Sequence, residues 1–432
     1  MNILQLTPGT GSFYCGSCLR DNDLAAALLR AGHDAQIFPL YLPFMLEEGP
    51  QETPVHMGGI NMYLQQVAPW LPRLPRFLAK ALDAPRLLRW ASRRPGMTDP
   101  SGLGAMTLSM LRGEEGRQAR ELDDLIGWVR ELERPDVVLL SNVMLIGLAR
   151  RLKEALGCPV VCTLQGEAPF LDSLPAKDSS ACWETLRERG QDISQFIAVS
   201  RYTASLMGER MSIDPSRMQV VPNGIDVRDF GAAESAPERP TIGYLARMCA
   251  DKGLPELVDA FLELRSRASI PGLRLLAGGV VLGEDEALLT DLRGRVRAAG
   301  AEADVEFRAN MTRAQKIDLL RSLTVLSVPA RYGESFGLYL LEAMACGVPV
   351  VQPDMHGFSE VVEATGGGLL YDPDSPLGLA DKLEALLGNP KQLAELRRSG
   401  LEAVRDNFNA DQMGQQVASV CRMAASAGRV GA

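Results

Sequence analysis

The sequence alternates short apolar runs with helical patterns, and this alternation occurs twice. In the first half, strand-like runs appear at NILQL, DAQIFPL, PDVVLLS, CPVVCTL, QFIAVS and MQVVP, with helical stretches between them. The pattern restarts at TIGYLA and continues through LRLLAGG, VEF, TVLSVPA and PVVQP. Continuous apolar strands with intervening helices are typical of parallel sheets that are covered on both faces. The chain is therefore predicted to be an α/β protein with two doubly wound, Rossmann-like domains.

A polar stretch separates the two alternations and sets the expected domain boundary. The segment VRDFGAAESAPERP is rich in alanine, glutamate and proline, which is typical of a linker. We expect one domain over residues 1–225 and a second over residues 226–409. Ligands of doubly wound sheets bind at the carboxyl ends of the strands, near the switch in strand order. Two such domains are therefore expected to face each other across an interdomain cleft.

Composition excludes several classes of protein. The 432 residues carry a formal net charge of −9, which disfavours a general nucleic-acid binder. The start MNILQLTPGTGS lacks a basic region before its short apolar run and is predicted to be a strand, not a signal peptide. No apolar run in the sequence is long enough to span a bilayer. The cysteines are irregularly spaced, and Cys158, Cys162 and Cys346 lie in apolar runs as small core residues. A cytoplasmic protein is expected.

One segment does not follow the alternation. Residues 42–134 are expected to form a mostly helical insertion in the first domain. Its central part combines apolar residues at helical spacing with charges that are nearly all basic, namely Arg73, Arg76, Lys80, Arg86, Arg89, Arg93 and Arg94. One interpretation is a helical flap with solvated arginines. The alternatives are an acceptor lid or a peripheral docking face for anionic lipid at the inner face of the membrane.

Two glutamates stand in the otherwise apolar segment RYGESFGLYLLEAMACGVPVV. Burial of a carboxylate without a partner is unfavourable, so Glu334 and Glu342 need an explanation. If Ser335 caps a helix that begins at Phe336, the two acids lie about 12 Å apart along the axis and point to a similar side. That arrangement suits one elongated ligand held at two points, because a carboxylate accepts hydrogen bonds from two sugar hydroxyls. The alternative is that each acid pairs with a basic residue of a neighbouring element.

The same region offers groups that can bind an anion. In a helix beginning at Phe336, the backbone N–H groups of Phe336, Gly337 and Leu338 are available to an anion between the two acids. Upstream, in GYLARMCADKG, Arg247 follows the first strand of the second domain and Lys252 lies five residues later. Two cations at the carboxyl end of a strand can neutralise a departing diphosphate. The alternative is a loop that carries a solvated arginine and lysine.

These motifs together resemble a known family. V-x-N-G-I-D at residues 221–226, G-x-x-x-R-x-x-x-x-K-G, and E-S-F-G-L-x-x-L-E-A-M-A-x-G-x-P-V-V are similar to motifs of the family-four retaining glycosyltransferases of the GT-B fold. The resemblance covers nearly the whole chain and is weak in the 42–134 insertion. It implies transfer of a hexose-type sugar from a nucleotide-diphosphate sugar with retention of anomeric configuration. It also implies that a last helix at about residues 410–427 packs back on the first domain.

The resemblance assigns roles in the second domain. It implies that Glu334 contacts donor sugar hydroxyls, that Glu342 contacts the ribose, and that Arg247 and Lys252 bind the diphosphate. The catalytic candidates are therefore Arg247, Lys252 and Glu334. The backbone of residues 308–311 is implied to lie near the base.

A further donor-side loop departs from the family pattern. In PDMHGFSEVVE, relatives usually have two glycines, and here His356 stands in place of the first while Gly357 follows. Both are donor-side candidates. For His356, a donor contact and a plain surface histidine remain equally open.

The amino-terminal loop resembles the family's glycine-rich first loop. In TPGTGSFYCGSCLRDNDL, Gly16 falls on the second glycine of the usual pair and Cys15 on the first. Amides at the start of the following helix can bind the donor diphosphate or the acceptor. Arg20 and Asp21 are acceptor-side candidates. Cys15 and Cys18 form a C-x-x-C pair, which we interpret as small loop and helix-start residues because no second pair of metal ligands accompanies them.

A second departure follows the fourth strand of the first domain. Relatives often have a histidine there, whereas VVCTLQGEAPF has Gln165, followed by Gly166 and Glu167. A glutamine is neither acid nor base, but it can hydrogen-bond a sugar hydroxyl. Gln165 and Glu167 are further acceptor-side candidates, with capping of the next segment as the alternative for Glu167.

No metal or other cofactor is expected. The DPD at residues 372–374 looks like a metal motif, but its place between a strand and a helix start favours turn and capping roles. The expected partners are a nucleotide-sugar donor and a sugar, lipid or small-molecule acceptor. The alternatives on the same fold are a sugar-nucleotide epimerase, a glycoside phosphorylase, and a non-catalytic nucleotide-sugar-binding protein.

Overall fold

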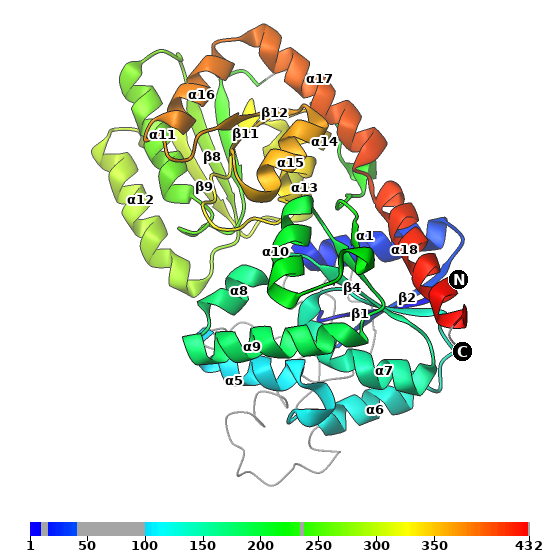
Figure 1. The fold of residues 1–432 in the computed structure, drawn as a ribbon. Coiled ribbons are helices and arrows are strands. Elements are labelled where there is room, and N and C mark those ends of the chain that lie inside the picture. The colour runs from blue at the N-terminus through cyan, green and yellow to red at the C-terminus, as the bar shows by residue number, and fades with distance from the viewer. Residues whose placement is uncertain (10–15, 41–99, 234–236, 431–432) are drawn as a thin grey trace. The chain divides into compact units, whose positions relative to one another are not determined.

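The chain forms two compact units (Figure 1). The computed structural model describes four stretches of it, residues 1–9, 16–40, 100–233 and 237–430. Unit 1 comprises Met1–Pro222 together with Met413–Ala432, and unit 2 comprises Asn223–Gln412. The sequence-based division at residues 225 and 226 lies a few residues beyond this one.

Unit 1 is built on a six-stranded parallel sheet with the strand order β2-β1-β3-β4-β5-β6. Its strands are β1 (Asn2–Thr7), β2 (Asp34–Pro39), β3 (Val137–Leu140), β4 (Val160–Leu164), β5 (Gln195–Ala198) and β6 (Met218–Val220). All residues of β3 and β4 are buried, as expected for strands with helices on both faces. The strands that follow β2 lie on the other side of β1, so the switch in strand order falls between β1 and β3.

Helices cover both faces of this sheet and define two hydrophobic clusters. They are α1 (Gly16–Arg30), α5 (Pro100–Leu111), α6 (Ala119–Val129), α7 (Ala149–Leu156), α8 (Ala168–Ser173), α9 (Ala176–Arg189), α10 (Arg201–Met211) and the last helix α18 (Ala410–Val430). Residues of α6 to α10 pack in one cluster. In the other, Met413 and Val417 of α18 lie with Ile3 of β1 and Leu24 of α1. The carboxyl-terminal helix therefore buries its apolar stripe within unit 1.

Unit 2 is built on a second six-stranded parallel sheet, in the order β12-β11-β10-β7-β8-β9. Its strands are β7 (Thr241–Leu245), β8 (Arg274–Gly279), β9 (Val305–Ala309), β10 (Val325–Leu326), β11 (Val350–Pro353) and β12 (Gly368–Tyr371). Its helices are α11 (Leu254–Arg267), α12 (Glu286–Ala298), α13 (Arg313–Arg321), α14 (Leu338–Ala345), α15 (His356–Thr365), α16 (Gly378–Leu387) and α17 (Pro390–Asn407). Figure 1 shows α11 and α12 against one face and α14 and α15 against the other. The switch in strand order falls between β7 and β10.

The predicted class, two doubly wound parallel-sheet units of Rossmann type, is confirmed. The cysteines predicted to be core residues, Cys158, Cys162 and Cys346, are buried. Of the predicted insertion, residues 41–99 lie outside the described residues, and with them its basic segment and the predicted lid or lipid contact. Its later part, from residue 100 on, contains α5 and α6. None of the helices in the described stretches combines the length and apolarity that a bilayer crossing requires.

Candidate functional site

The predicted donor-side residues of unit 2 gather at the carboxyl ends of β7 and β10. Arg247 and Lys252 lie in the loop between β7 and α11, and Glu334 lies in the loop between β10 and α14. The two strands are neighbours, with Val325 opposite Ile242. Because the order of strands reverses here, the two loops diverge above the sheet and leave their side chains at its edge.

Lys252 and Glu334 form an ion pair at this edge. The Nζ atom of Lys252 donates to Oε2 of Glu334 at 2.7 Å, and the two side chains are 21% and 12% exposed. Burial alone would lower the pKa of Lys252, but Glu334 and Tyr332 outweigh burial, and the pKa lies above its ordinary value. The ammonium is therefore charged throughout the physiological pH range. Each buried charge has a partner, which removes most of the cost of burying either alone.

Two tyrosines complete the surroundings of this pair. The hydroxyl of Tyr339 donates to Oε2 of Glu334 at 3.1 Å. The Lys252 ammonium lies 4.7 Å from the ring centroid of Tyr332 and 5.9 Å from that of Tyr339. Burial, reinforced by Glu334, raises the pKa of Tyr332 to about 12. Burial also raises the pKa of Tyr339, so both phenols are neutral near pH 7. Sequence analysis did not identify these tyrosines.

Arg247 is held by two acids that sequence analysis also missed. Its guanidinium binds Asp285 through two bonds, Nε to Oδ2 at 2.8 Å and Nη2 to Oδ1 at 3.0 Å. Nη2 also contacts Glu284. Asp285 is 6% exposed, whereas Glu284 is 65% exposed. The buried acid fixes the orientation of the arginine, and the exposed acid is a weak, exchangeable partner.

Glu342 forms a second lysine pair within unit 2. It lies in α14, and its Oε1 accepts a hydrogen bond from Nζ of Lys316 in α13 at 2.7 Å. Both side chains are mostly buried, at 14% and 17% exposure. The ammonium also lies 6.0 Å from the ring centroid of Phe230. Glu334 and Glu342 thus each pair with a lysine of another element, which is the alternative that the sequence analysis left open. One ion pair leaves further lone pairs on each carboxylate for ligand hydroxyls.

The helix that carries Glu342 begins later than expected. We expected Ser335 as the cap and helical residues from Phe336, but α14 begins at Leu338 and its N-cap is Gly337. Gly337 has φ +84°, a left-handed conformation that glycine adopts without strain. That conformation turns the chain into the helix, while Phe336 is buried before it. Glu334 therefore lies outside the helix, and the expected 12 Å spacing along one axis does not apply.

The loop with His356 and Gly357 packs directly on the Glu334 loop. The amide of Gly357 donates to the carbonyl oxygen of Glu334 at 3.0 Å. His356, the first residue of α15, has φ +54°. This left-handed conformation favours glycine, and glycine is the residue that the resemblance leads one to expect there. Burial lowers the pKa of His356, against the opposing effect of Glu334, so the imidazole is neutral near pH 7.

Replacement of Gly357 by alanine is expected to destabilise unit 2 by about 1–3 kcal/mol, the usual cost of overpacking. A Cβ atom at this position would lie 2.2 Å from the carbonyl oxygen of Ser335, so the Glu334 loop must shift. Urea denaturation followed by far-UV circular dichroism measures the change. The matched control is Gly294→Ala in α12, where a Cβ atom meets nothing within 4 Å. Equal stability of the two variants would contradict the prediction and show that the Glu334 loop shifts at no cost in the free energy of unfolding.

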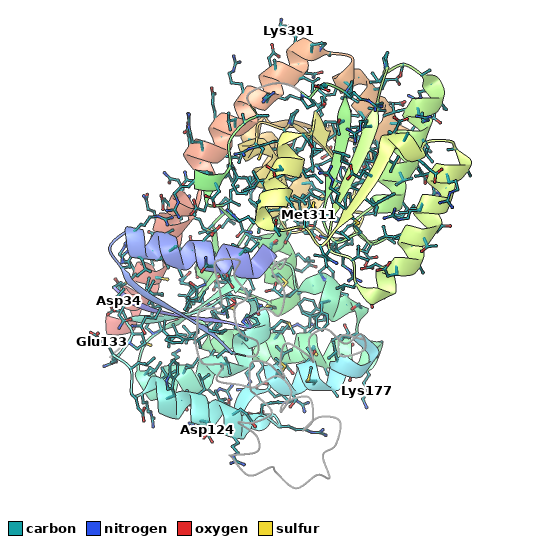
Figure 2. All side chains as sticks on the ribbon, turned by 180° about the vertical axis from the view of Figure 1, so that it is seen from behind. Asp34, Asp124, Glu133, Lys177, Met311 and Lys391 are labelled. Carbon is teal, nitrogen blue, oxygen red and sulfur yellow. The ribbon has the colours of Figure 1, made fainter. Side chains whose placement is uncertain are left out.

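The backbone implied to lie near the base follows β9. Asn310 has φ +54°, and its amide donates to the carbonyl of Gly279 at the end of β8 at 2.8 Å. Met311, labelled in Figure 2, is buried beside it. Arg308 pairs with Glu306. The segment therefore turns sharply at the carboxyl ends of β8 and β9, in the same unit and at the same sheet edge as Lys252.

In unit 1, the acceptor-side candidates Arg20 and Asp21 form a buried pair at the switch between β1 and β3. Nη1 of Arg20 donates to Oδ1 of Asp21 at 3.0 Å, and both residues are 1% exposed. Thr7, at the end of β1, donates its hydroxyl to Oδ2 at 2.9 Å. Burial raises the pKa of Asp21, against the opposing effects of Arg20, Thr7 and Ser141. The pair fixes the start of α1 against the ends of these strands.

Gln165 and Glu167 lie at the end of β4. The side-chain amide of Gln165 donates to the carbonyl of Ser141 at 2.7 Å, just beyond β3. Glu167 accepts from three backbone amides, those of Val143 at 3.0 Å, Gln165 at 2.9 Å and Gly166 at 2.8 Å. It makes no side-chain capping bond to α8. Glu167 stands at the N-cap position of α8, as the alternative expected, but its carboxylate fixes the loop that presents Gln165.

The remaining candidates are placed only in part. Gly16 is the exposed first residue of α1, whereas Cys15 and the side chain of Cys18 lie outside the described residues. The carboxylate of Asp372 accepts from the amide of Asp374 at 3.0 Å, as expected for a turn. Among the described residues, no group of three or more histidine, cysteine or acidic side chains is arranged to hold a metal ion.

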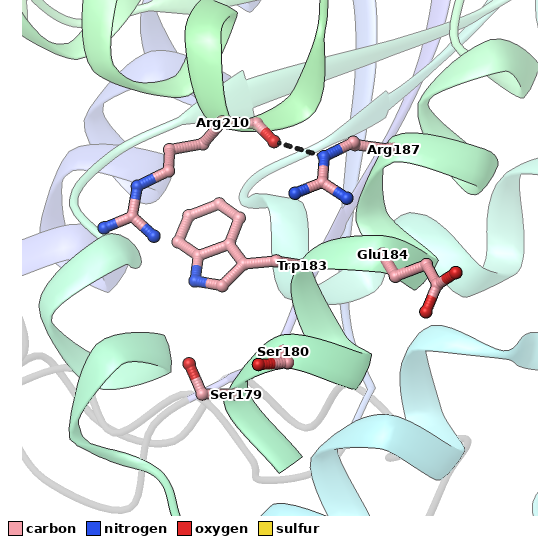
Figure 3. Close-up of a pocket in the computed structure, with 6 residues that line it drawn as sticks. All are labelled: Ser179, Ser180, Trp183, Glu184, Arg187 and Arg210. Atoms are coloured by element: carbon pink, nitrogen blue, oxygen red, sulfur yellow. Dashed lines mark hydrogen bonds between the residues drawn. The ribbon is translucent and has the colours of Figure 1, made fainter. Parts of the chain in front are cut away.

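A surface pocket on unit 1 contains none of the predicted residues (Figure 3). It is lined by α9 and by Arg210 of α10. Arg210 covers the ring of Trp183 at 4.8 Å, and its carbonyl accepts from Nε of Arg187 at 2.9 Å. Trp183 is 4% exposed, so its ring is not open to a ligand. These contacts join α9 to α10.

Two family models match consecutive parts of the chain. The model described as Glycosyltransferase Family 4 matches residues 105–229. The model described as Glycosyl transferases group 1 matches residues 228–402, which contain both lysine–glutamate pairs of unit 2.

Similar proteins include D-inositol 3-phosphate glycosyltransferases of several bacteria. That of Segniliparus rotundus is 27% identical over 315 residues, which cover 70% of this chain and 66% of that protein. That of Jonesia denitrificans is 32% identical over 232 residues, which cover 49% of this chain and only 54% of that protein. That of Acidothermus cellulolyticus is 27% identical over 420 residues, which cover 87% of this chain and 88% of that protein.

Solved structures share the fold over nearly the whole chain. The Anabaena protein HepE in complex with UDP matches with a TM-score of 0.69 and 17% identity, covering 98% of this chain and 100% of that one. Sucrose-phosphate synthase from Thermosynechococcus elongatus also matches with a TM-score of 0.69 and 17% identity, covering 99% and 100%. The two family models match consecutive parts of the chain, and the chain has the two parallel-sheet units of this fold. The chain therefore belongs to the family-four glycosyltransferases of the GT-B fold.

Proposed function

We propose that the protein transfers a hexose from a UDP-sugar to an inositol phosphate, with retention of anomeric configuration and without a metal ion. The observation that carries the proposal is the Lys252–Glu334 pair at the carboxyl ends of β7 and β10. It combines a permanent positive charge for a diphosphate with a carboxylate for sugar hydroxyls.

The diphosphate would be neutralised by Lys252 and Arg247. Asp285 holds the guanidinium of Arg247 in place through two bonds, while Glu284 is an exposed partner. We propose that the diphosphate displaces Glu284 and leaves the Asp285 contact intact. A charged group that is already oriented stabilises the developing negative charge without reorganisation at the moment of reaction. UDP is the nucleotide proposed because solved structures of the same fold were determined with UDP and with UDP-glucose.

In the proposed step, the bond between the sugar C1 and the phosphate oxygen breaks, and a bond between C1 and the acceptor oxygen forms on the same face. The acceptor hydroxyl gives its proton to the departing phosphate oxygen, so no protein base is required. Glu334 would hold hydroxyls of the donor sugar, and Glu342 would hold the ribose hydroxyls.

The acceptor proposal rests on the relatives. Proteins named D-inositol 3-phosphate glycosyltransferases match this chain over both units. On the acceptor side we propose Gln165, whose loop Glu167 fixes, as a hydrogen-bonding partner of an acceptor hydroxyl.

The experiment incubates the purified chain with UDP-glucose, UDP-N-acetylglucosamine or GDP-mannose and with D-inositol 3-phosphate, and measures the nucleoside diphosphate released. Unphosphorylated inositol is the acceptor control. We expect release with a UDP-sugar, dependence on the acceptor phosphate, unchanged rates in EDTA, and an α-linked product by NMR.

Each part of the proposal fails separately. Release of nucleoside diphosphate with GDP-mannose alone would overturn the proposal that the donor nucleotide is UDP. Equal rates with unphosphorylated inositol would overturn the proposal that the acceptor phosphate is recognised. A β-linked product would overturn retention, and loss of activity in EDTA that added Mg²⁺ restores would overturn metal independence.

A further inference from the structure

Tyr339 shares an oxygen atom of Glu334 with Lys252. The Lys252 ammonium and the Tyr339 hydroxyl both donate to Oε2, at 2.7 and 3.1 Å. Among the described residues, these two side-chain hydrogen bonds to the carboxylate both end on Oε2. The other oxygen, Oε1, thus keeps its lone pairs for a ligand.

The ring of Tyr339 is itself fixed in place. Tyr339 is the second residue of α14, and its ring centroid lies 6.5 Å from that of Phe358 in α15. Phe358 is fully buried, and α15 also contacts the Glu334 loop through the Gly357 amide. The phenol therefore projects from a rigid corner of unit 2, and its hydroxyl has little freedom to leave Glu334.

Lys252 alone does not fix the carboxylate. An ammonium on a flexible four-carbon stem donates in several directions, so an ion pair with it leaves the carboxylate able to rotate. A second donor on the same oxygen, from a different direction, restricts that rotation. The ring of Tyr332 lies 4.7 Å from the ammonium and restrains the lysine.

We propose that Tyr339 is a positioning residue that orients Glu334 so that Oε1 meets the hydroxyls of the donor sugar. This inference rests on the proposed function, because it takes the donor to be a UDP-sugar. The residue acts through Glu334 and is assigned no contact with the nucleotide. Its loss should therefore weaken the part of binding that the sugar contributes and leave the UDP part intact.

The test is Tyr339→Phe, which removes one hydroxyl and keeps the ring against Phe358, so the fold is expected to persist. Isothermal titration calorimetry compares the dissociation constants of UDP, UDP-glucose and UDP-N-acetylglucosamine for the parent and the variant. A hydrogen bond to a charged group supports an expected loss of about tenfold for the UDP-sugar that serves as donor. The constant for UDP is expected to stay within about twofold of the parent's. The control is Tyr371→Phe, a buried tyrosine at the end of β12 in the same unit.

The outcomes separate this inference from the proposed function. Equal weakening of UDP and UDP-sugar in Tyr339→Phe would show a general structural role and overturn the inference, as would no change in either. If the parent binds UDP but Tyr339→Phe leaves the advantage of the UDP-sugar over UDP intact, only the positioning role fails. If the parent binds neither UDP nor a UDP-sugar, the proposed donor fails, and the inference fails with it.

Discussion

Replacement of Lys252 by methionine is expected to lower kcat/KM by about 10²–10³-fold, the scale for losing one preorganised donor to a developing negative charge. Lys252 is mostly buried, and its pKa lies above the ordinary value because the effects of Glu334 and Tyr332 together outweigh burial. Methionine keeps much of the length and removes the charge. Steady-state kinetics with the donor selected by the screen measures the change.

The control for this variant is Lys391→Met on the exposed surface of α17 (Figure 2). It removes the same charge far along the chain from the site and should leave kcat/KM within about twofold. Because Lys252→Met leaves the Glu334 carboxylate without its ammonium, thermal unfolding must accompany the kinetics. If a folded Lys252→Met variant retains activity within a few-fold of the parent, Lys252 does not neutralise the donor diphosphate as proposed.

Arg247→Ala is also expected to lower kcat/KM. The guanidinium of Arg247 binds Asp285, so part of the loss will arise because this buried acid is left without a partner. Comparison of Arg247→Ala with the double variant Arg247→Ala/Asp285→Asn separates the two contributions, because the double variant leaves no buried carboxylate without its partner.

The fold was accessible from the sequence because of how parallel strands are buried. β3 and β4 are buried along their whole length, so they are read in the sequence as continuous apolar runs without alternation. Every strand expected from such a run is present. β10 is shorter than its apolar run, with two residues in the sheet, since the chain leaves the ladder early to form the Glu334 loop.

The start of α14 could not be predicted from local sequence. Ser335 is a good capping residue type, but the helix begins after Gly337, which has a left-handed conformation and lies against Leu340 and Phe358. His356 also has a positive φ. One sign of this conformation is present in the sequence: relatives usually have a glycine at the position of His356.

The partners of the charged residues were inaccessible for a different reason. Lys252 and Glu334 are 82 residues apart, and Lys316 and Glu342 are 26 apart. Single-sequence patterns carry no signal for pairing at such distances. The residue types at the site could be predicted because their chemistry is specific, but which cation meets which acid is a property of the fold.

Replacement of Arg189 by methionine is expected to destabilise unit 1 by about 1–3 kcal/mol, the cost of losing hydrogen bonds from a buried charged donor to groups that remain partly solvated. Arg189 ends α9, and its side chain is 1% exposed. It donates to Glu114 at 2.8 Å and to the carbonyl of Arg112 at 2.7 Å. These bonds fasten the turn after α5 to the body of unit 1.

Tryptophan fluorescence isolates this unfolding transition. Trp128 and Trp183 are described residues of unit 1, and the sequence has no tryptophan beyond Pro222, so unit 2 contributes no tryptophan emission of its own. Urea denaturation curves of the parent and Arg189→Met give the difference in the free energy of unfolding. The control is Arg150→Met, which also contacts Glu114 but is 32% exposed. Its expected cost is below about 1 kcal/mol, as for solvent-exposed pairs.

The pH dependence provides a second check on Arg189. Burial would raise the pKa of Glu114, but the hydrogen bond and charge of Arg189, a backbone hydrogen bond and the charge of Arg150 together outweigh burial, and the pKa lies below its ordinary value of 4.5. A carboxyl whose pKa is depressed by folding contributes stability above its unfolded pKa and loses it as pH falls through the folded pKa. The difference between the parent and Arg189→Met should therefore be largest near neutral pH and shrink below about pH 4.5. A difference that stays constant from pH 7 to pH 4 would mean that the aliphatic part of Arg189 packs the turn and that its charge contributes little.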